Sequence, residues 1–276
     1  MSDDKTFDSS RRAFMQNAAT ASGAALATAV GSKTLVQSQT APPLSGNMVE
    51  YKSGDLMIPT YFSPAKTSKK KGAPAVLVIH EVFGLNDHIK SVADRFADAG
   101  YNGLAPNFFI RAEETPPKDT SDMTKLRRAA SSIPTDVAIK DMQAGLDYLK
   151  TVRNVLPRFA SVGFCMGGGF SYQLATHSKD LACAAIFYGR TPVDLVPQVS
   201  CPLLGCFGAL DKGIPPEKVK EFEEALKKAG KQADIKIYEG AGHGFFNNTR
   251  PEAYNAEAAT DAWQRVLKFY QQYLGS

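Results

Sequence analysis

Residues 159–178, FASVGFCMGGGFSYQLATHS, have the pattern of a strand, a tight turn and a helix. Aromatic and β-branched residues precede the turn, and apolar residues recur at helical spacing after it. Cys165 stands at the apex, with Gly163 and Gly167 two residues away on either side. The pattern G-F-C-M-G is that of a nucleophile elbow with cysteine in place of serine. It predicts a strained turn that presents the Cys165 thiol at the end of a buried strand.

A free cysteine is more often a small buried residue than a reactive one. The elbow favours a reactive Cys165, because the first turn of the following helix offers the Met166 N–H and a positive dipole to a thiolate. Cys183 and Cys206 lie in apolar, strand-like runs, and Cys201 precedes a proline. We therefore interpret those three cysteines as structural.

The composition is that of an ordinary globular chain with one substantial core. It has 276 residues, of which 43% are hydrophobic and 22% charged, and a formal net charge of +4. The sequence has no basic stripe with interleaved aromatic residues, so nucleic acid is not an expected partner. Four cysteines without a C-x-x-C pair and four dispersed histidines predict neither a disulfide framework nor a metal site. No cofactor is expected.

The amino-terminal segment resembles a twin-arginine export signal. Residues 9–15, SSRRAFM, contain Arg11 and Arg12 ahead of a weakly apolar, alanine-rich run over residues 18–30. That run is too short and too weakly hydrophobic to predict a stable membrane span. We expect a signal peptide over residues 1–29, a linker over 30–44 and an exported, periplasmic α/β domain over 45–276, with the twin-arginine machinery as a partner.

Downstream, strand and helix patterns alternate. A hairpin over residues 48–62 is expected at a sheet edge, followed by a fully apolar strand over 73–81. The further expected strands are 101–106, the elbow strand, 182–188, 203–207 and 235–238, and the expected helices are 87–99, 136–152, the elbow helix, 218–229 and 252–274. Residues 107–133 are a polar region expected to fold over the site. The alternation predicts an α/β fold with a doubly wound, mostly parallel sheet and helices on both faces.

Candidate catalytic residues fall at the carboxyl ends of three strands, the edge at which such sheets bind ligands. Cys165 follows the elbow strand, Asp211 follows the next-but-one strand in GALDKGIP, and His243 follows the last strand in EGAGHGF. This order of nucleophile, acid and histidine is the one expected of the α/β-hydrolase fold. We predict that His243 takes the thiol proton and that Asp211 fixes the imidazole tautomer.

An oxyanion hole is expected from the N–H groups of Val82, in the loop after the first central strand, and of Met166. The simplest role for the neighbouring Glu81 is a hydrogen bond within that loop. His80, His88 and His177 are interpreted as structural, although the sequence leaves open that His80 lines the site.

Taken together, VIHEVFGLND, GFCMGGG, GALDKGIP and GAGHGFF make residues 45–275 similar to the dienelactone hydrolase family of cysteine-dependent α/β-hydrolases. The resemblance implies a triad of Cys165, Asp211 and His243. It also implies that Glu81 interacts with the resting thiol until substrate displaces it. The family binds its substrate carboxylate with arginines, one of them four residues after the triad histidine, where this chain has Asn247.

Arg250 lies slightly beyond that position. The family's other substrate-binding arginine falls in a variable region, where this chain has Arg127 and Arg128. We therefore expect this chain to share the family's hydrolytic mechanism more closely than its dienelactone substrate.

A thiol nucleophile favours small esters and lactones over peptides, because an enol or phenol oxygen leaves the tetrahedral intermediate more readily than an amine. The leading hypothesis is hydrolysis of such a small molecule through an acyl-thioester. Two alternatives stay open: a non-catalytic extracytoplasmic binding or thiol-sensing module, for which Asn247 is the motivation, and a thiol peptidase.

Overall fold

The structure is a computed structural model that describes residues 43–66, 72–114 and 120–275. The expected signal peptide over residues 1–29 lies outside the described residues, and so does the expected linker up to residue 42. In the described part of the chain, no helix combines the length and the apolar character needed to cross a membrane.

Eight strands form a single sheet within the described residues, in the order β1-β2-β4-β3-β5-β6-β7-β8. The strands are β1 (Asn47–Ser53), β2 (Leu56–Ser63), β3 (Ala73–Ile79), β4 (Asn102–Pro106), β5 (Val155–Phe164), β6 (Leu181–Phe187), β7 (Leu203–Gly208) and β8 (Ala233–Tyr238). β1 and β2 form the antiparallel hairpin expected at the edge, and β3 to β8 run parallel. The predicted mostly parallel sheet is confirmed.

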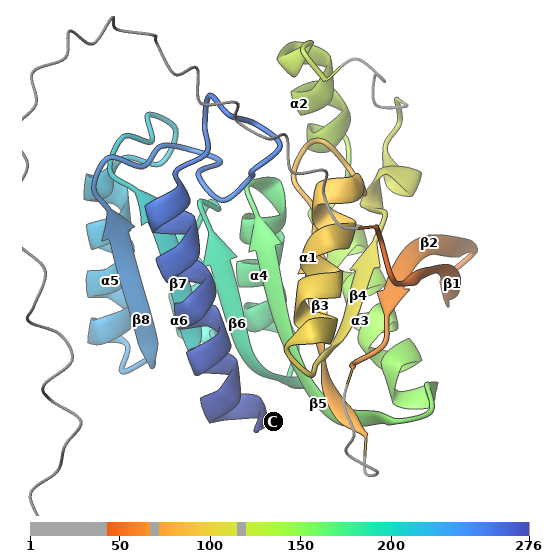
Figure 1. Ribbon diagram of the computed structural model, residues 1–276. Helices are drawn as coiled ribbons and strands as arrows, with labels where there is room; N and C mark the ends of the chain where they lie inside the picture. Colours follow the sequence, from red (N-terminus) through yellow and green to blue (C-terminus); the bar gives the residue numbers. More distant parts are fainter. Residues whose placement is uncertain (1–42, 67–71, 115–119, 276) are drawn as a thin grey trace, which may run out of the picture. The chain divides into compact units, whose positions relative to one another are not determined.

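Helices cover both faces of the sheet (Figure 1). α1 (Asp87–Asp98) and α6 (Ala256–Leu274) pack on one face, and α3 (Thr135–Thr151), α4 (Met166–His177) and α5 (Pro216–Lys228) pack on the other. Each face has its own apolar core, so every residue of β3 is buried on one side or the other. This is the predicted α/β-hydrolase fold.

Residues 107–133 hold two helical segments that the sequence analysis did not identify: η2 (Phe108–Arg111) and α2 (Met123–Ser131). Asp122 caps α2 by accepting a hydrogen bond from the Lys125 N–H at 3.0 Å. Figure 1 shows α2 beyond the carboxyl ends of the parallel strands, so this helix lies at the end of the sheet where the predicted site residues are.

Two other boundaries differ from expectation. α6 begins at Ala256 rather than near residue 252, because the Asn255 side chain caps it by accepting from the Ala258 N–H at 3.0 Å. A short helical segment, η3 (Val193–Gln198), follows β6 where no element was expected, and it contains Pro197.

A buried ion pair fastens η2 to the rest of the domain. Arg111 makes two 2.9 Å hydrogen bonds to the carboxylate of Asp141 on α3. The Asp141 side chain is fully buried. The same guanidinium donates to the Ser53 carbonyl of the hairpin at 3.0 Å. η2, α3 and β1 are thereby held together beneath the site.

Candidate active site

The nucleophile elbow is formed as the sequence predicts. Cys165 joins β5 to α4 with φ 56° and ψ −116°, a conformation that a residue with a Cβ rarely adopts. Its N–H donates to the Phe187 carbonyl at 3.0 Å, and its carbonyl accepts from the Gly169 N–H at 3.2 Å. Hydrogen bonds on both sides of the residue hold the strained turn in place.

The two flanking glycines are required by close backbone contact. A Cβ on Gly163 would overlap the Gly167 carbonyl, and a Cβ on Gly167 would lie 2.6 Å from the His80 carbonyl and closer still to that of Ile79. All the opposing atoms belong to the backbone, so they cannot rotate away. The glycines therefore let the start of α4 approach the ends of β3 and β5.

Asp211 and His243 lie at the same edge as Cys165. Asp211 follows β7 in a turn that its own Oδ1 stabilises by accepting from the Gly213 and Ile214 N–H groups, at 2.8 and 3.1 Å. Its Oδ2 pairs with His243 Nδ1 at 2.7 Å. One carboxylate thus both shapes its turn and orients the imidazole.

The charges of these three residues are coupled. Burial alone lowers the pKa of His243, but hydrogen bonds with Asp211 and Cys165 outweigh it and raise the pKa to about 10. Burial likewise raises the pKa of Asp211, yet the bonds from His243 and from two backbone N–H groups bring it below its usual value. The structure therefore brings the predicted sulfur, imidazole and carboxylate together, and these contacts favour the charged form of the imidazole.

Glu81 contacts side chains rather than the loop backbone that the sequence analysis favoured as the simplest partner. Its Oε2 accepts from Asn247 Nδ2 at 2.6 Å and its Oε1 from the Tyr188 hydroxyl at 3.3 Å. Burial raises the pKa of Glu81 in spite of these bonds. Asn247, expected only as the position that lacks an arginine, is thus a direct partner of Glu81.

Tyr188 is a site residue that the sequence reasoning missed. It is fully buried at the carboxyl end of β6 with φ 39°, and its ring packs edge-on against His243 at 5.1 Å between centroids. It thereby joins Glu81 to the imidazole. The signal for it was its position: it directly follows an apolar strand at the edge where ligands bind.

Val82 and Met166, the expected oxyanion-hole residues, lie in one apolar cluster with Cys165. Val82 opens a turn closed by a 3.1 Å hydrogen bond from the Gly84 N–H to the Glu81 carbonyl, with Gly84 at φ 74°. Met166 is the first residue of α4, so its N–H needs a partner outside the helix. Both residues are therefore next to the thiol.

The other face of that cluster comes from α2. Leu126 and Ala130 are buried there, and Met123, Phe83 and Phe109 pack against them. The thiol therefore borders an apolar wall formed by α2, the loop after β3, η2 and the first residue of α4. Its members are Val82, Phe83, Phe109, Met123, Leu126, Ala130 and Met166.

The arginines considered for substrate binding are exposed to solvent or paired with other side chains. Arg127 and Arg128 are exposed on the solvent face of α2, and Arg128 pairs with Glu114 at 2.6 Å. Arg250 lies over the Phe83 ring at 4.7 Å and bonds Glu252 through Nε at 2.8 Å.

The remaining histidines have structural partners. His80 is fully buried, accepts from the Phe108 N–H through Nε2 at 3.0 Å and pairs through Nδ1 with the Glu81 carbonyl at 2.7 Å. It supports the loop that carries Glu81 and Val82. Burial lowers the pKa of His80 and of His88 to about 4. His177 bonds the Gln173 carbonyl at the end of α4.

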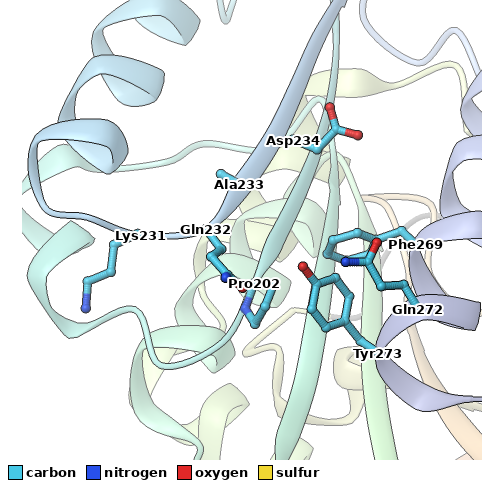
Figure 2. A pocket seen from close by; sticks show the side chains of 8 residues that line it. All are labelled: Pro202, Lys231, Gln232, Ala233, Asp234, Phe269, Gln272 and Tyr273. Carbon is cyan, nitrogen blue, oxygen red and sulfur yellow. The ribbon is translucent and has the colours of Figure 1, made fainter.

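Besides these residues, the described part of the chain contains a cavity and three further cysteines. A cavity of about 430 Å³ lies at the amino ends of β7 and β8 beside the last turns of α6, away from Cys165 (Figure 2). Among the described residues, no group of three or more histidine, cysteine or acidic side chains is arranged to hold a metal ion. Cys183, Cys201 and Cys206 are buried, and burial raises their thiol pKa values.

Comparison with known proteins places this site in a family. The model of the dienelactone hydrolase family matches residues 61–274. A protein of Escherichia coli K12 with the provisional name carboxymethylenebutenolidase is 32% identical over 266 residues, which cover 92% of this chain and 96% of that protein.

Solved structures agree. A provisionally named dienelactone hydrolase from Klebsiella pneumoniae superposes with a TM-score of 0.78 at 28% identity, covering 83% of this chain and 99% of that one. The dienelactone hydrolase-like promiscuous phosphotriesterase P91 shares the fold, with a TM-score of 0.72 at 23% identity over 84% of this chain and 99% of that one. The family match, the relatives and the fold lead to one conclusion: this chain is a hydrolase that belongs to the dienelactone hydrolase family.

Proposed function

We propose that the protein hydrolyses a small carboxylic ester or lactone through an acyl-thioester on Cys165. The observation that carries the proposal is the 2.7 Å pair between Asp211 and His243, together with the rise in the His243 pKa that Asp211 and Cys165 cause. Three groups from distant parts of the chain converge as nucleophile, base and orienting acid.

The steps follow from that arrangement. His243 takes the Cys165 proton, the thiolate adds to the ester carbonyl, and the Val82 and Met166 N–H groups receive the developing oxyanion. The intermediate expels the alkoxide or phenoxide, which takes the proton from the imidazolium. Water then attacks the thioester with His243 as general base, releasing the acid and restoring the thiol.

Glu81 enters the proposal through the family resemblance, in which this position interacts with the resting thiol and releases it when substrate binds. In this structure the Glu81 carboxyl is bonded to Asn247 and Tyr188. Because Tyr188 also packs on His243, the position of Glu81 is linked to that of the base.

Substitution of the nucleophile tests the mechanism. Cys165→Ala is expected to abolish turnover of p-nitrophenyl acetate, while Cys201→Ala, at a buried cysteine outside the site, retains it. Mass spectrometry of the quenched wild type should show one acetyl group on a peptide containing Cys165. Wild-type turnover by the Cys165→Ala variant would reject the proposal.

The same assay separates the alternatives. Acylation of Cys165 without release would favour a thiol-sensing module, and comparable activity on amide substrates would favour a peptidase. Membership of a hydrolase family favours turnover over mere binding.

We also propose that the twin-arginine pathway exports the protein to the periplasm. The support is Arg11 and Arg12 within SSRRAFM, ahead of the alanine-rich run and the small-x-small site at residues 27–29. Replacing both arginines by lysine in the full chain should leave the protein in the cytoplasm, with the single Lys5→Arg change as control. Unchanged export would refute this assignment.

A further inference from the structure

The surroundings of the thiol are apolar on the side formed by α2. Met123 and Leu126 of α2 pack with Phe83 of the loop after β3, in the cluster that also contains Cys165. A substrate group placed against these side chains loses its water and gains no hydrogen-bonding partner from them. Such a surface favours alkyl or aryl groups over charged ones.

The cations near this surface are directed elsewhere. Arg127 and Arg128 lie on the solvent side of α2, opposite Leu126. Arg250 lies over the Phe83 ring at 4.7 Å and is paired with Glu252 through two bonds of 2.7 and 2.8 Å. A carboxylate on the substrate would therefore find no ready counter-ion among these three arginines.

Inside the site, the acidic group is itself held by neutral donors. Glu81 is 2% exposed and is bonded by the Asn247 amide and the Tyr188 hydroxyl, neither of which carries a charge. A second carboxylate brought beside it would lose its water without gaining a charged partner from these two donors. The site thus disfavours anionic substrates by desolvation.

From these contacts we infer that the substrate group held between α2 and residues 82–83 is apolar and uncharged. The inference rests on the proposed ester or lactone hydrolysis and narrows it: the protein selects neutral esters and lactones over those that carry a second carboxylate. Met123 and Phe83, which are partly exposed members of the wall, are the specificity-determining residues of this subsite.

A matched pair of substrates tests this inference on the full-length wild-type protein. The 4-nitrophenyl ester of monomethyl adipate and that of hydrogen adipate differ only in a methyl group and a negative charge. We expect kcat/KM for the neutral ester to exceed that for the acid on the order of 100-fold at pH 7.5. Equal rates, or a preference for the acid, would overturn the inference and leave the hydrolase proposal intact. Failure to turn over either ester would instead count against the proposed function.

A charge placed on the wall tests its location. Met123→Arg should shift the ratio of kcat/KM toward the acid by at least tenfold, because Met123 is part of the cluster around Cys165. The control is Thr124→Arg, which adds the same charge on the exposed side of α2 and should leave the wild-type ratio unchanged. Circular dichroism establishes that both variants are folded. An unchanged ratio in folded Met123→Arg would refute the subsite, and the wild-type measurement decides the substrate class without either variant.

Discussion

Replacing Asp211 by asparagine separates the two tasks of that carboxylate. Oδ1 accepts from the Gly213 and Ile214 N–H groups and so shapes the turn, whereas Oδ2 pairs with His243. An asparagine retains the first acceptor and turns an N–H donor toward the imidazole in place of the second. We therefore expect the Asp211→Asn variant to keep its fold while His243 loses its orienting partner.

The expected cost to stability is small. A charge-assisted hydrogen bond contributes roughly 1.5–3 kcal/mol, which solvent screening reduces to about 1 kcal/mol here, since 41% of the His243 side chain is exposed. That corresponds to a fall in Tm of about 2–4 °C for a domain of this size. The Asp211→Ala substitution removes both acceptors, so the Tm of that variant should fall further.

The expected cost to turnover is large. With Nδ1 no longer facing a carboxylate, the imidazole favours the tautomer whose protonated nitrogen faces Cys165 and cannot accept its proton. The corresponding change in a serine triad lowers kcat about 10⁴-fold, and we expect a loss on the order of 10³-fold or more. The readouts are kcat for p-nitrophenyl acetate and urea unfolding of the same samples.

The pH dependence of stability provides a second readout. Burial lowers the pKa of His243, but its bonds with Asp211 and Cys165 raise it from 6.5 to about 10. This group therefore stabilises the fold fully below pH 6.5, and the contribution is lost as the pH rises toward 10. In the Asp211→Asn variant, stability should therefore depend less steeply on pH between 6.5 and 10. Near wild-type turnover together with an unchanged pH dependence would show that Asp211 does not act on His243.

Three further predictions concern the supporting structure. Gly167→Ala places a Cβ 2.6 Å from the His80 carbonyl, so it should cost about 1–3 kcal/mol in urea unfolding and also lower kcat. Arg111→Met leaves the Asp141 carboxylate buried without its cation, so a loss of about 3–5 kcal/mol is expected by the same measurement, and a near-neutral effect would contradict it. His88 is buried with a pKa lowered to about 4, so calorimetry should show stability falling as the pH drops from 6.5 to 4, with a shallower fall in His88→Phe.

The fold could be predicted because its signals are local. The apolar run of β3, the alternating hairpin and the glycine-flanked cysteine each report a backbone conformation from neighbouring residues. Helix α2 was missed because it is short and directs only Leu126 and two alanines inward, which is a weak periodic signal. Asp122, as its cap, was the available cue.

The site was predictable only as far as it depends on position along the chain. Strand order brings Cys165, Asp211 and His243 to one edge whatever their side chains then contact. The partners of Glu81 could not be obtained in this way, because Asn247 and Tyr188 lie 166 and 107 residues away and meet it only through packing. The roles themselves remain predictions, to be decided by the variants.

The position of α2 bears on how substrate choice is separated from chemistry in this protein. The reacting groups stand on the segments that follow β5, β7 and β8, and backbone contacts fix the elbow, as the requirement for glycine at residue 167 illustrates. The apolar wall instead comes from a short helix joined to the domain mainly through side chains such as Leu126. A substitution on α2 therefore changes what the thiol meets without moving the elbow, so specificity can vary here while the hydrolytic geometry stays constant.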